Sequence, residues 1–270
     1  MKLCRFQPLE FAATAVTRAP HEVHPPALHG IVEGETIHEF SGELWGARER
    51  TGRKWPVASV KFLPPSQPSK IVCVGKNYAD HAAEMGGVPP KDPLIFLKPP
   101  SAVLAPEEPI VIPPISQRVD YEGELAVIIG RRCHLLGSND DTRPYILGYT
   151  CLNDVTARDL QKADGQWTRG KGFDTFCPFG PLLESSLNLA DTRLETFLNG
   201  SRKQSAGPSE MIFSVDVIIK WIAQVMTLEP GDVIATGTPA GIGTLSSGDV
   251  VEVSITGIGT LRNPVMASAD

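Results

Sequence analysis

The sequence predicts a β-rich α+β fold with few short helices and a small N-terminal module. Short apolar runs with many β-branched residues recur along the 270 residues, and turn residues separate almost all of them. Only a few segments have the apolar spacing of a helix. The 25 glycines and 24 prolines also favour strands and turns over alternating βαβ units.

The N-terminal part of the chain predicts a module of its own. A hairpin is expected here around a turn at Glu33-Gly34. The proline-rich residues 64–68 that follow predict a linker or a stiff surface connection. We therefore expect a small β module in residues 1–65 and a main domain in residues 70–270.

The main domain contains most of the predicted elements. Strands are expected at residues 71–74, 94–97, 110–112, 122–129, 146–152, 180–183, 192–198, 232–235 and 249–255. Helices are expected at residues 78–85, 156–164 and 214–226, and the last of these has apolar side chains at helical spacing. Helices are thus fewer than strands.

Charge and apolar content exclude several classes of function. The net charge is −6, from 25 Lys and Arg against 31 Asp and Glu, and there is no basic run, so nucleic acid is not an expected partner. No apolar stretch reaches about 18 residues, and the N-terminus lacks the apolar core and cleavage site of a signal peptide. We therefore expect a cytoplasmic protein without a membrane partner. The 5 cysteines are scattered without a C-x-x-C pair, which indicates reduced thiols.

Three carboxylates recur at every second position before an apolar run. Asp120, Glu122 and Glu124 share one face of a strand, because successive side chains alternate. Their mutual repulsion favours a hard divalent cation with oxygen ligands among them. The alternative is a polar strand edge that faces water.

A further carboxylate follows the predicted strand 146–152. Asp154 lies where a strand end turns into a helix, which is a common place for functional residues. It is a candidate third ligand beside Glu122 and Glu124, with open positions left on an octahedral Mg²⁺ or Mn²⁺. The alternative is that Asp154 only caps the helix.

A histidine and a glutamate lie one turn apart on the predicted helix 78–85. The Glu84 carboxylate is close enough there to orient the His81 imidazole and to increase its basicity, as in a general base. Gly86 and Gly87 offer a hinge for closure over a ligand. The alternative is an ordinary pair on the surface of a helix.

Two lysines are candidates for binding an anionic substrate. Lys171 lies between two glycines, where the backbone can approach a ligand, and Lys98 lies at a predicted strand end. Each is equally compatible with a solvated surface lysine. The glycine-rich residues 236–243 lack the ending of a P-loop, but their N–H groups and the Thr238 hydroxyl are suited to cradling a carboxylate.

Taken together, five motifs resemble the fumarylacetoacetate hydrolase family. They are G-K-N-Y-A-D-H-A-A-E (75–84), D-Y-E-G-E-L-A (120–126), N-D-V-T-A-R-D (153–159), K-G-F-D-T-F-C-P (171–178) and A-T-G-T-P-A-G-I-G (235–243). The resemblance covers about residues 70 to 265. It implies a mixed β-sheet roll or partly closed barrel, a divalent-metal site and a homodimer.

The resemblance also assigns roles to residues. It implies metal ligands at Glu122, Glu124 and Asp154, a catalytic His–Glu pair at His81 and Glu84, and an active-site lysine at Lys171. It places Arg158 and Gln161 at positions that contact the substrate carboxylate, and Thr238 near the same pocket. Lys76 stands where some similar sequences have arginine, so a point charge replaces a bidentate clamp there.

The expected chemistry is that of a metal-dependent enzyme for small 2-oxo or dicarboxylic acids. Mg²⁺, or Mn²⁺ or Ca²⁺, would chelate a pyruvate-like substrate and stabilise its enolate. Hydrolysis of a C–C bond in an acylpyruvate is the first expectation. Isomerisation or decarboxylation of a 2-hydroxydienedioate or of oxaloacetate is the alternative, and a non-catalytic metabolite-binding module is a further one.

Overall fold

A mixed sheet of 12 strands runs through the part of the chain that the computed structural model describes, residues 1–12 and 27–268. Its order is β4 (Glu49–Pro56), β3 (Thr36–Ser41), β2 (Leu28–Glu33), β1 (Lys2–Pro8), β14 (Cys177–Glu184), β12 (Ile146–Asn153), β11 (Gly123–Ile129), β17 (Val233–Ala235), β6 (Ile71–Gly75) and β7 (Leu94–Lys98). Off this path, β5 (Val60–Leu63) pairs with β1 and β8 (Val103–Leu104) pairs with β14. The pairs β17–β6 and β14–β8 are parallel and the others are antiparallel, so the sheet is mixed as expected.

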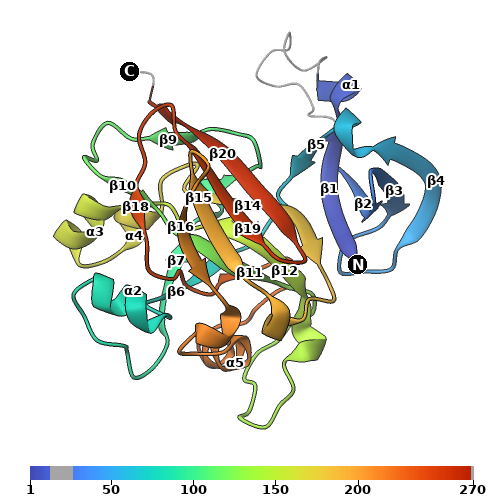
Figure 1. Cartoon of the computed structure of the whole chain (residues 1–270). Helices are drawn as coiled ribbons and strands as arrows, with labels where there is room; N and C mark the ends of the chain where they lie inside the picture. Colours follow the sequence, from blue (N-terminus) through green and yellow to red (C-terminus); the bar gives the residue numbers. More distant parts are fainter. Residues whose placement is uncertain (13–26, 269–270) are drawn as a thin grey trace.

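A second sheet packs on this one and closes the roll (Figure 1). Its order is β16 (Ser201–Ala206), β15 (Leu194–Leu198), β19 (Val250–Ile255), β20 (Gly259–Ala267) and β9 (Ile110–Ile112). Apolar side chains of both sheets meet in the core between them, with Leu125 and Cys151 from the first sheet against Leu194 and Val253 from the second. A small sheet of β13 (Thr156–Ala157), β10 (Val119–Tyr121) and β18 (Gly243–Thr244) lies beside the site described below. These sheets confirm the expected strand-rich roll.

The helices in the described residues are short. The described ones are α1 (Leu9–Ala12), α2 (Ala79–Glu84), α3 (Arg158–Asp164), α4 (Thr168–Lys171) and α5 (Val215–Val225), with 3₁₀ turns at Val57–Ser59, Pro100–Ala102, Arg143–Tyr145, Leu189–Asp191 and Pro208–Glu210. The apolar side of α5 packs on the sheet, and the Ser214 side chain caps its first turn. The helices α2, α3 and α4 gather on the side of the molecule away from the N-terminal strands (Figure 1). No helix in the described ranges is long and apolar enough to cross a membrane.

All of the expected strands and helices are present, with shifted ends. The expected strand 122–129 begins at Gly123, and Glu122 lies between β10 and β11, which belong to different sheets. The expected helix 156–164 begins at Arg158, because Thr156–Ala157 pairs with β10. Helix α4 was not expected from the sequence, since it is a single turn with a glycine inside it.

The N-terminal strands continue the main sheet. The predicted hairpin is β2–β3, with a turn at Gly34 and Glu35, one residue later than expected, and Gly34 has a φ of +61°. Strand β1 joins it to the main domain, because Leu3 pairs with Leu183 of β14. The division into residues 1–65 and 70–270 as separate folding units stays a prediction.

The proline-rich connection packs against the main domain. Pro64, Pro65 and Ser66 are buried, and the Ser66 hydroxyl donates to the carbonyl of Gly231 at 2.8 Å. The buried Asp232 carboxylate accepts hydrogen bonds from the backbone N–H groups of Ser69 and Lys70, both at 3.1 Å. The expected surface connection is therefore wrong at residues 64–66, because turn-like composition does not report what the segment packs against.

Candidate active site

A cavity of about 260 Å³ opens between the main sheet and the helices α2, α3 and α4. It is lined by Val74, Gly75, Lys76, His81, Met85, Phe96, Glu122, Glu124, Asp154, Arg158, Gln161, Lys162, Gly165, Trp167, Lys171 and Thr238. Most of the side chains that the sequence assigned to the site are among them. Of the predicted residues, Glu84 and Lys98 do not line the cavity but contact residues that do.

Three buried carboxylates converge at the inner end of the cavity. One ligand oxygen from each of Glu122, Glu124 and Asp154 lies within 4.8 Å of those from the other two. The antiparallel pairing of β11 with β12 brings them together, because Gly123 pairs with Asn153 and the Asp154 N–H donates to the Glu122 carbonyl at 2.8 Å. The three residues are at most 4 % exposed, so the alternative of a polar edge facing water does not describe them.

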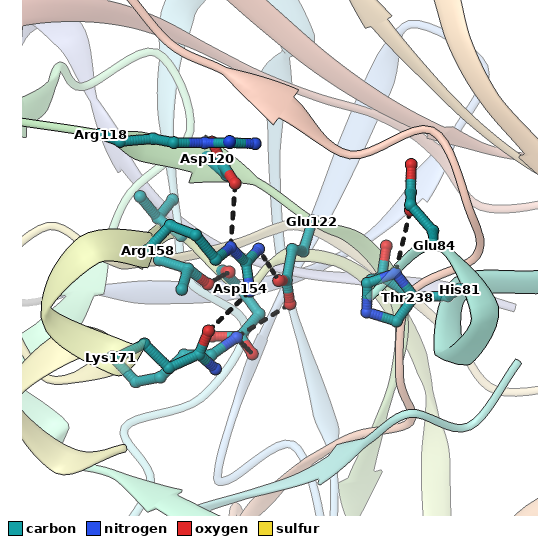
Figure 2. Close-up of polar contacts among 12 residues, drawn as sticks. His81, Glu84, Arg118, Asp120, Glu122, Asp154, Arg158, Lys171 and Thr238 are labelled. Atoms are coloured by element: carbon teal, nitrogen blue, oxygen red, sulfur yellow. Dashed lines mark hydrogen bonds and ion pairs between the residues drawn. The ribbon is translucent and has the colours of Figure 1, made fainter. Parts of the chain in front are cut away.

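Two lysines from different elements compensate part of this negative charge. Lys171 Nζ in α4 donates to Glu122 Oε2 at 2.8 Å and to Asp154 Oδ2 at 2.6 Å (Figure 2). Lys98 Nζ at the end of β7 donates to Asp154 Oδ1 and to the carbonyl of Val155. Burial alone would lower the pKa of Lys171, but Asp154 and Glu122 outweigh it and raise the pKa well above its ordinary value. Lys171 is therefore a buried cation and not a neutral base.

Arg158 provides a third positive charge at the inner end (Figure 2). Its guanidinium donates from Nη2 to Glu122 Oε1, from Nε to Asp120 Oδ2 at 2.9 Å and from Nη1 to Gln161 Oε1 at 2.7 Å. Asp120 also accepts a hydrogen bond from Arg118 Nε at 2.9 Å. It therefore orients Arg158 and lies outside the cluster of three carboxylates. Burial would raise the pKa of Glu122, but the charges of Lys171 and Arg158 hold it well below its ordinary value.

Glu124 has no cationic partner among the described residues. Within the described residues its carboxylate accepts one hydrogen bond, from the backbone N–H of Gly237 to Oε2 at 2.7 Å. Burial, with the charges of Asp154 and Glu122, raises the pKa of Glu124 well above its ordinary value. A buried carboxylate in this position needs a proton or a cation. The oxygen-only donor set therefore fits a hard divalent cation such as Mg²⁺ or Mn²⁺.

The glycine loop after β17 binds protein carboxylates. Gly237 has a φ of +101°, and a Cβ added there would lie 2.7 Å from the Cβ of Asn77, so only glycine fits. Its N–H donates to Glu124, and the N–H of Gly241 donates to Glu84 at 3.1 Å. The sequence indicated a carboxylate-binding loop here, and in the structure its partners come from the chain itself.

His81 and Glu84 form the expected pair on α2. His81 Nδ1 lies 3.2 Å from Glu84 Oε2, and the imidazole side chain is only 6 % exposed (Figure 2). The alternative of a pair on a helix surface therefore does not hold for His81. In the neutral ring, a hydrogen bond from Nδ1–H to this carboxylate leaves Nε2 as the proton acceptor, and the ring lines the cavity.

Two further predicted residues, Thr238 and Lys76, line the cavity. Thr238 lines the cavity, but its hydroxyl donates to the Gly123 carbonyl at 2.9 Å and accepts from Gln204 Nε2 at 2.7 Å. Lys76 lines the cavity and has a left-handed φ of +57°.

An aromatic wall was missed by the sequence reasoning. The rings of Phe96 and Trp167 meet edge to face at 5.1 Å between centroids, and Lys171 Nζ lies 5.1 Å from the centre of the Phe96 ring. Spacing alone gave a usable signal, because Phe96 shares a strand face with Lys98 and Trp167 lies one helical turn before Lys171.

The fold and the cavity together define a strand-rich protein with a buried cluster of oxygen ligands and a His–Glu pair. The profile described as "Fumarylacetoacetate (FAA) hydrolase C-terminal" matches residues 70–266, and one described as "Rv2993c-like, N-terminal" matches residues 26–65. The chain therefore belongs to the fumarylacetoacetate hydrolase family, whose members are enzymes.

Two curated relatives illustrate the range of similarity. Protein Rv2993c of Mycobacterium tuberculosis is 52% identical over 86% of this chain and 88% of its own. Oxaloacetate tautomerase FAHD2B, mitochondrial, of Bos taurus is 42% identical over 78% of this chain and 71% of its own.

Two solved structures have the same fold over the whole chain. A 2-hydroxyhepta-2,4-diene-1,7-dioate isomerase from Mycobacterium marinum is 44% identical, with a TM-score of 0.87 and full coverage of both chains. A maleylpyruvate hydrolase from Sphingobium sp. SYK-6, in complex with manganese (II) ion and pyruvate, is 27% identical, with a TM-score of 0.78 and coverage of 100% of both chains.

Proposed function

We propose that this protein moves a proton on a pyruvate-like 2-oxo acid, as a keto–enol tautomerase or double-bond isomerase. The observation that carries the proposal is the His81–Glu84 pair, which is built into the cavity that holds the three carboxylates. Two relatives with a named activity agree with it, a tautomerase and an isomerase that are 42% and 44% identical to this chain.

The dyad supplies the base. His81 Nε2 takes the proton from the carbon next to the keto group and returns it to the oxygen or to the next carbon of the conjugated system. Glu84 Oε2, 3.2 Å from Nδ1, holds the ring in the required tautomer and stabilises the imidazolium while the proton is on the enzyme. Gly241 N–H keeps the Glu84 carboxylate in place.

The inner end of the cavity binds the 2-oxo acid group. Glu122, Glu124 and Asp154 would hold Mg²⁺ or Mn²⁺, with Ca²⁺ as a further candidate, and the bound cation supplies Lewis-acid polarisation of the keto group. Lys171 Nζ uses two of its three N–H groups on Glu122 and Asp154, and the third is available for negative charge that develops on the substrate. Lys98 holds Asp154 from outside the cavity and acts as a positioning residue.

Arg158 and Gln161 orient the substrate carboxylate. Each Nη atom of Arg158 has one N–H engaged in the protein, which leaves one free on each. Gln161 Oε1 accepts from Arg158, so the amide Nε2 of Gln161 is directed away from that bond and is available as a donor. Thr238 fixes the backbone of Gly123 at the base of the cavity.

Hydrolysis of a C–C bond is the second candidate. The same Nε2 of His81 can activate a water instead of removing a proton from carbon. The maleylpyruvate hydrolase with the same fold supports this branch, but its 27% identity is lower than that of the isomerase. The sequence alone favoured hydrolysis, and we place it second here because the tautomerase and the isomerase are more similar to this chain than the maleylpyruvate hydrolase is. The homodimer implied by the resemblance stays a prediction that light scattering of the purified protein would check.

The experiment is a product assay on three substrates with metal-free protein, with and without Mg²⁺. Oxaloacetate, a 2-hydroxydienedioate and an acylpyruvate are followed by ultraviolet absorbance and by mass spectrometry in deuterated water. We expect products of unchanged mass, apart from deuterium at the carbon next to the keto group. Formation of pyruvate and a second acid would establish hydrolysis. Release of CO₂ would establish decarboxylation. Absence of turnover with all three while Mg²⁺ binds would overturn the proposal in favour of a metabolite-binding module.

A further inference from the structure

We propose that Lys76 and Lys162 form a subsite at the cavity mouth for a second carboxylate, at the end of the substrate that lies farthest from Glu122, Glu124 and Asp154. This inference rests on the proposed function and deepens it, because it assigns the residues that select the substrate's tail. It starts from the distribution of charge around the cavity.

The cations at the inner end are all paired. Arg118, Arg158, Lys98 and Lys171 form ion pairs with Asp120, Glu122 and Asp154, and Glu124 is the carboxylate left for a bound cation. Lys76 and Lys162 also line the cavity, but neither ammonium has an ion pair or hydrogen bond within the described residues. Among the described residues that line the cavity, these two lysines are thus the ones whose ammonium groups have no partner in the protein.

Lys76 is held in a conformation that lysine rarely adopts. Its φ of +57° lies in the left-handed region, which is unfavourable for a residue with a Cβ. The next residue maintains it, because Asn77 Nδ2 donates to the carbonyls of Thr236 and Phe213 at 2.7 and 3.0 Å, and Asn77 Oδ1 accepts from the Phe213 N–H at 2.8 Å. Strain that persists under such a constraint is a mark of function.

The ammonium of Lys76 lies against the glycine turn that follows α2. A Cβ added to Gly87 would be 3.1 Å from Lys76 Nζ, so a larger residue there would crowd the ammonium. The segment that contains His81 thus places its turn beside Lys76. The lysine and the catalytic dyad therefore belong to the same wall of the cavity.

Lys162 comes from another element that lines the cavity. It lies on α3 one turn after Arg158, so one helix provides Arg158 and Gln161 to the inner end and Lys162 to the mouth. The helix ends at Gly165, which also lines the cavity and has nothing within 4 Å of where its Cβ would be. This end of the cavity is therefore open enough for a side chain as long as lysine to reach a ligand.

The cavity also has an apolar surface. Val74, Met85, Phe96 and Trp167 are among its lining residues, and the two aromatic rings pack edge to face. A second negative charge in the middle of a ligand would lose its hydration there without gaining a partner. The ligand that fits is an acid with an apolar or conjugated middle and a carboxylate at each end, one of them at the lysines.

The test compares two ligands of equal chain length, 2-oxoadipate and 2-oxohexanoate, which differ in the distal carboxylate. Their dissociation constants are measured by calorimetry with Mg²⁺-saturated protein, for the wild type, Lys76→Gln, Lys162→Gln and Lys162→Glu. Lys54→Gln is the matched control, since Lys54 is exposed on β4 and does not line the cavity. Circular dichroism confirms that each variant is folded.

We expect the wild type to bind 2-oxoadipate more tightly than 2-oxohexanoate. Each Gln variant should bind 2-oxoadipate about tenfold more weakly, because one charge-assisted hydrogen bond is lost. Its affinity for 2-oxohexanoate should be unchanged. Lys162→Glu should weaken 2-oxoadipate further. The subsite would be overturned if the wild type bound the two acids with equal affinity. It would also be overturned if each variant lost the same amount of affinity for both acids. The binding measurement does not depend on turnover. A failure of the proposed proton transfer would therefore appear in the product assay and not in these dissociation constants.

Discussion

Lys171 Nζ donates a 2.6 Å hydrogen bond to Asp154 Oδ2, which joins a one-turn helix to the end of a central strand. Both side chains are at most 2 % exposed, so the pair is shielded from water. The same ammonium also binds Glu122, and it therefore neutralises part of the charge of two candidate metal ligands at once. Stability and metal binding should both depend on this lysine.

Replacement of Lys171 by Met should destabilise the metal-free protein by about 3–5 kcal/mol, because two buried carboxylates lose their cation. Added Mg²⁺ should restore part of that loss. The measurement is urea unfolding with EDTA or with Mg²⁺. The control is Lys61→Met, which breaks a half-exposed pair with Glu108 and should change the free energy of unfolding by less than about 1 kcal/mol. Equal effects of the two substitutions would contradict the prediction.

The catalytic pair should be separable from the metal ligands. His81→Gln should lower kcat by about 10²–10⁴-fold, the usual contribution of a general base, with unchanged Mn²⁺ binding. Glu84→Gln should lower kcat less, because Nδ1 keeps a hydrogen-bond acceptor. Stopped-flow kinetics and Mn²⁺ titration provide the two readouts. The matched control is Glu107→Gln in an exposed ion pair with Arg262, and it should leave kcat unchanged.

Glu124→Gln should abolish metal binding without loss of stability in the metal-free protein. Burial and the neighbouring carboxylates disfavour the charge of Glu124, as its raised pKa indicates, and the amide removes that charge. Mg²⁺ should therefore raise the Tm of the wild type and not that of the variant. Glu35→Gln, in the exposed hairpin turn, serves as the control. A variant that still gains Tm with Mg²⁺ would argue against Glu124 as a ligand.

The cysteine thiols should be inert in the native protein. All five cysteines are buried and free, and burial raises the pKa of Cys4, Cys151 and Cys177 to about 12 from 9.0. The folded state therefore holds these protons more tightly than the unfolded state. The stability that results is present below pH 9 and is lost as the pH rises from about 9 towards about 12. A thiol reagent at pH 8 should label none of them until denaturant is added.

The candidate site was largely predictable where its signal is local. The two-residue spacing of Glu122 and Glu124 and the three-residue spacing of His81 and Glu84 follow from strand and helix periodicity. Asp154 was identified from its place at a strand end. The prediction of one continuous row of carboxylates was only partly right. The chain changes sheets at Glu122, and the Asp120 carboxylate accepts hydrogen bonds from Arg118 and Arg158.

Other features have no local signal. Lys98 was expected to bind substrate, but strand β7 places its ammonium behind Asp154, 56 residues away in the chain. Thr238 was expected at the pocket, and its hydroxyl is engaged by Gly123 and Gln204. In each case the partner is set by sheet register, which no window of the sequence reports.

By itself the sequence determined the strand-rich class, the positions of the carboxylates and the His–Glu spacing, because each depends on a period of two or of 3.6 residues. Only the tertiary structure decided which cations meet which carboxylates. It also decided that, in the part of the chain that the structure describes, Glu124 has no cationic partner and the ammonium groups of Lys76 and Lys162 are unpaired. Those outcomes depend on contacts between distant segments. They are fixed by strand pairing and by how the helices pack on the sheet, so they exist only once the whole chain has folded.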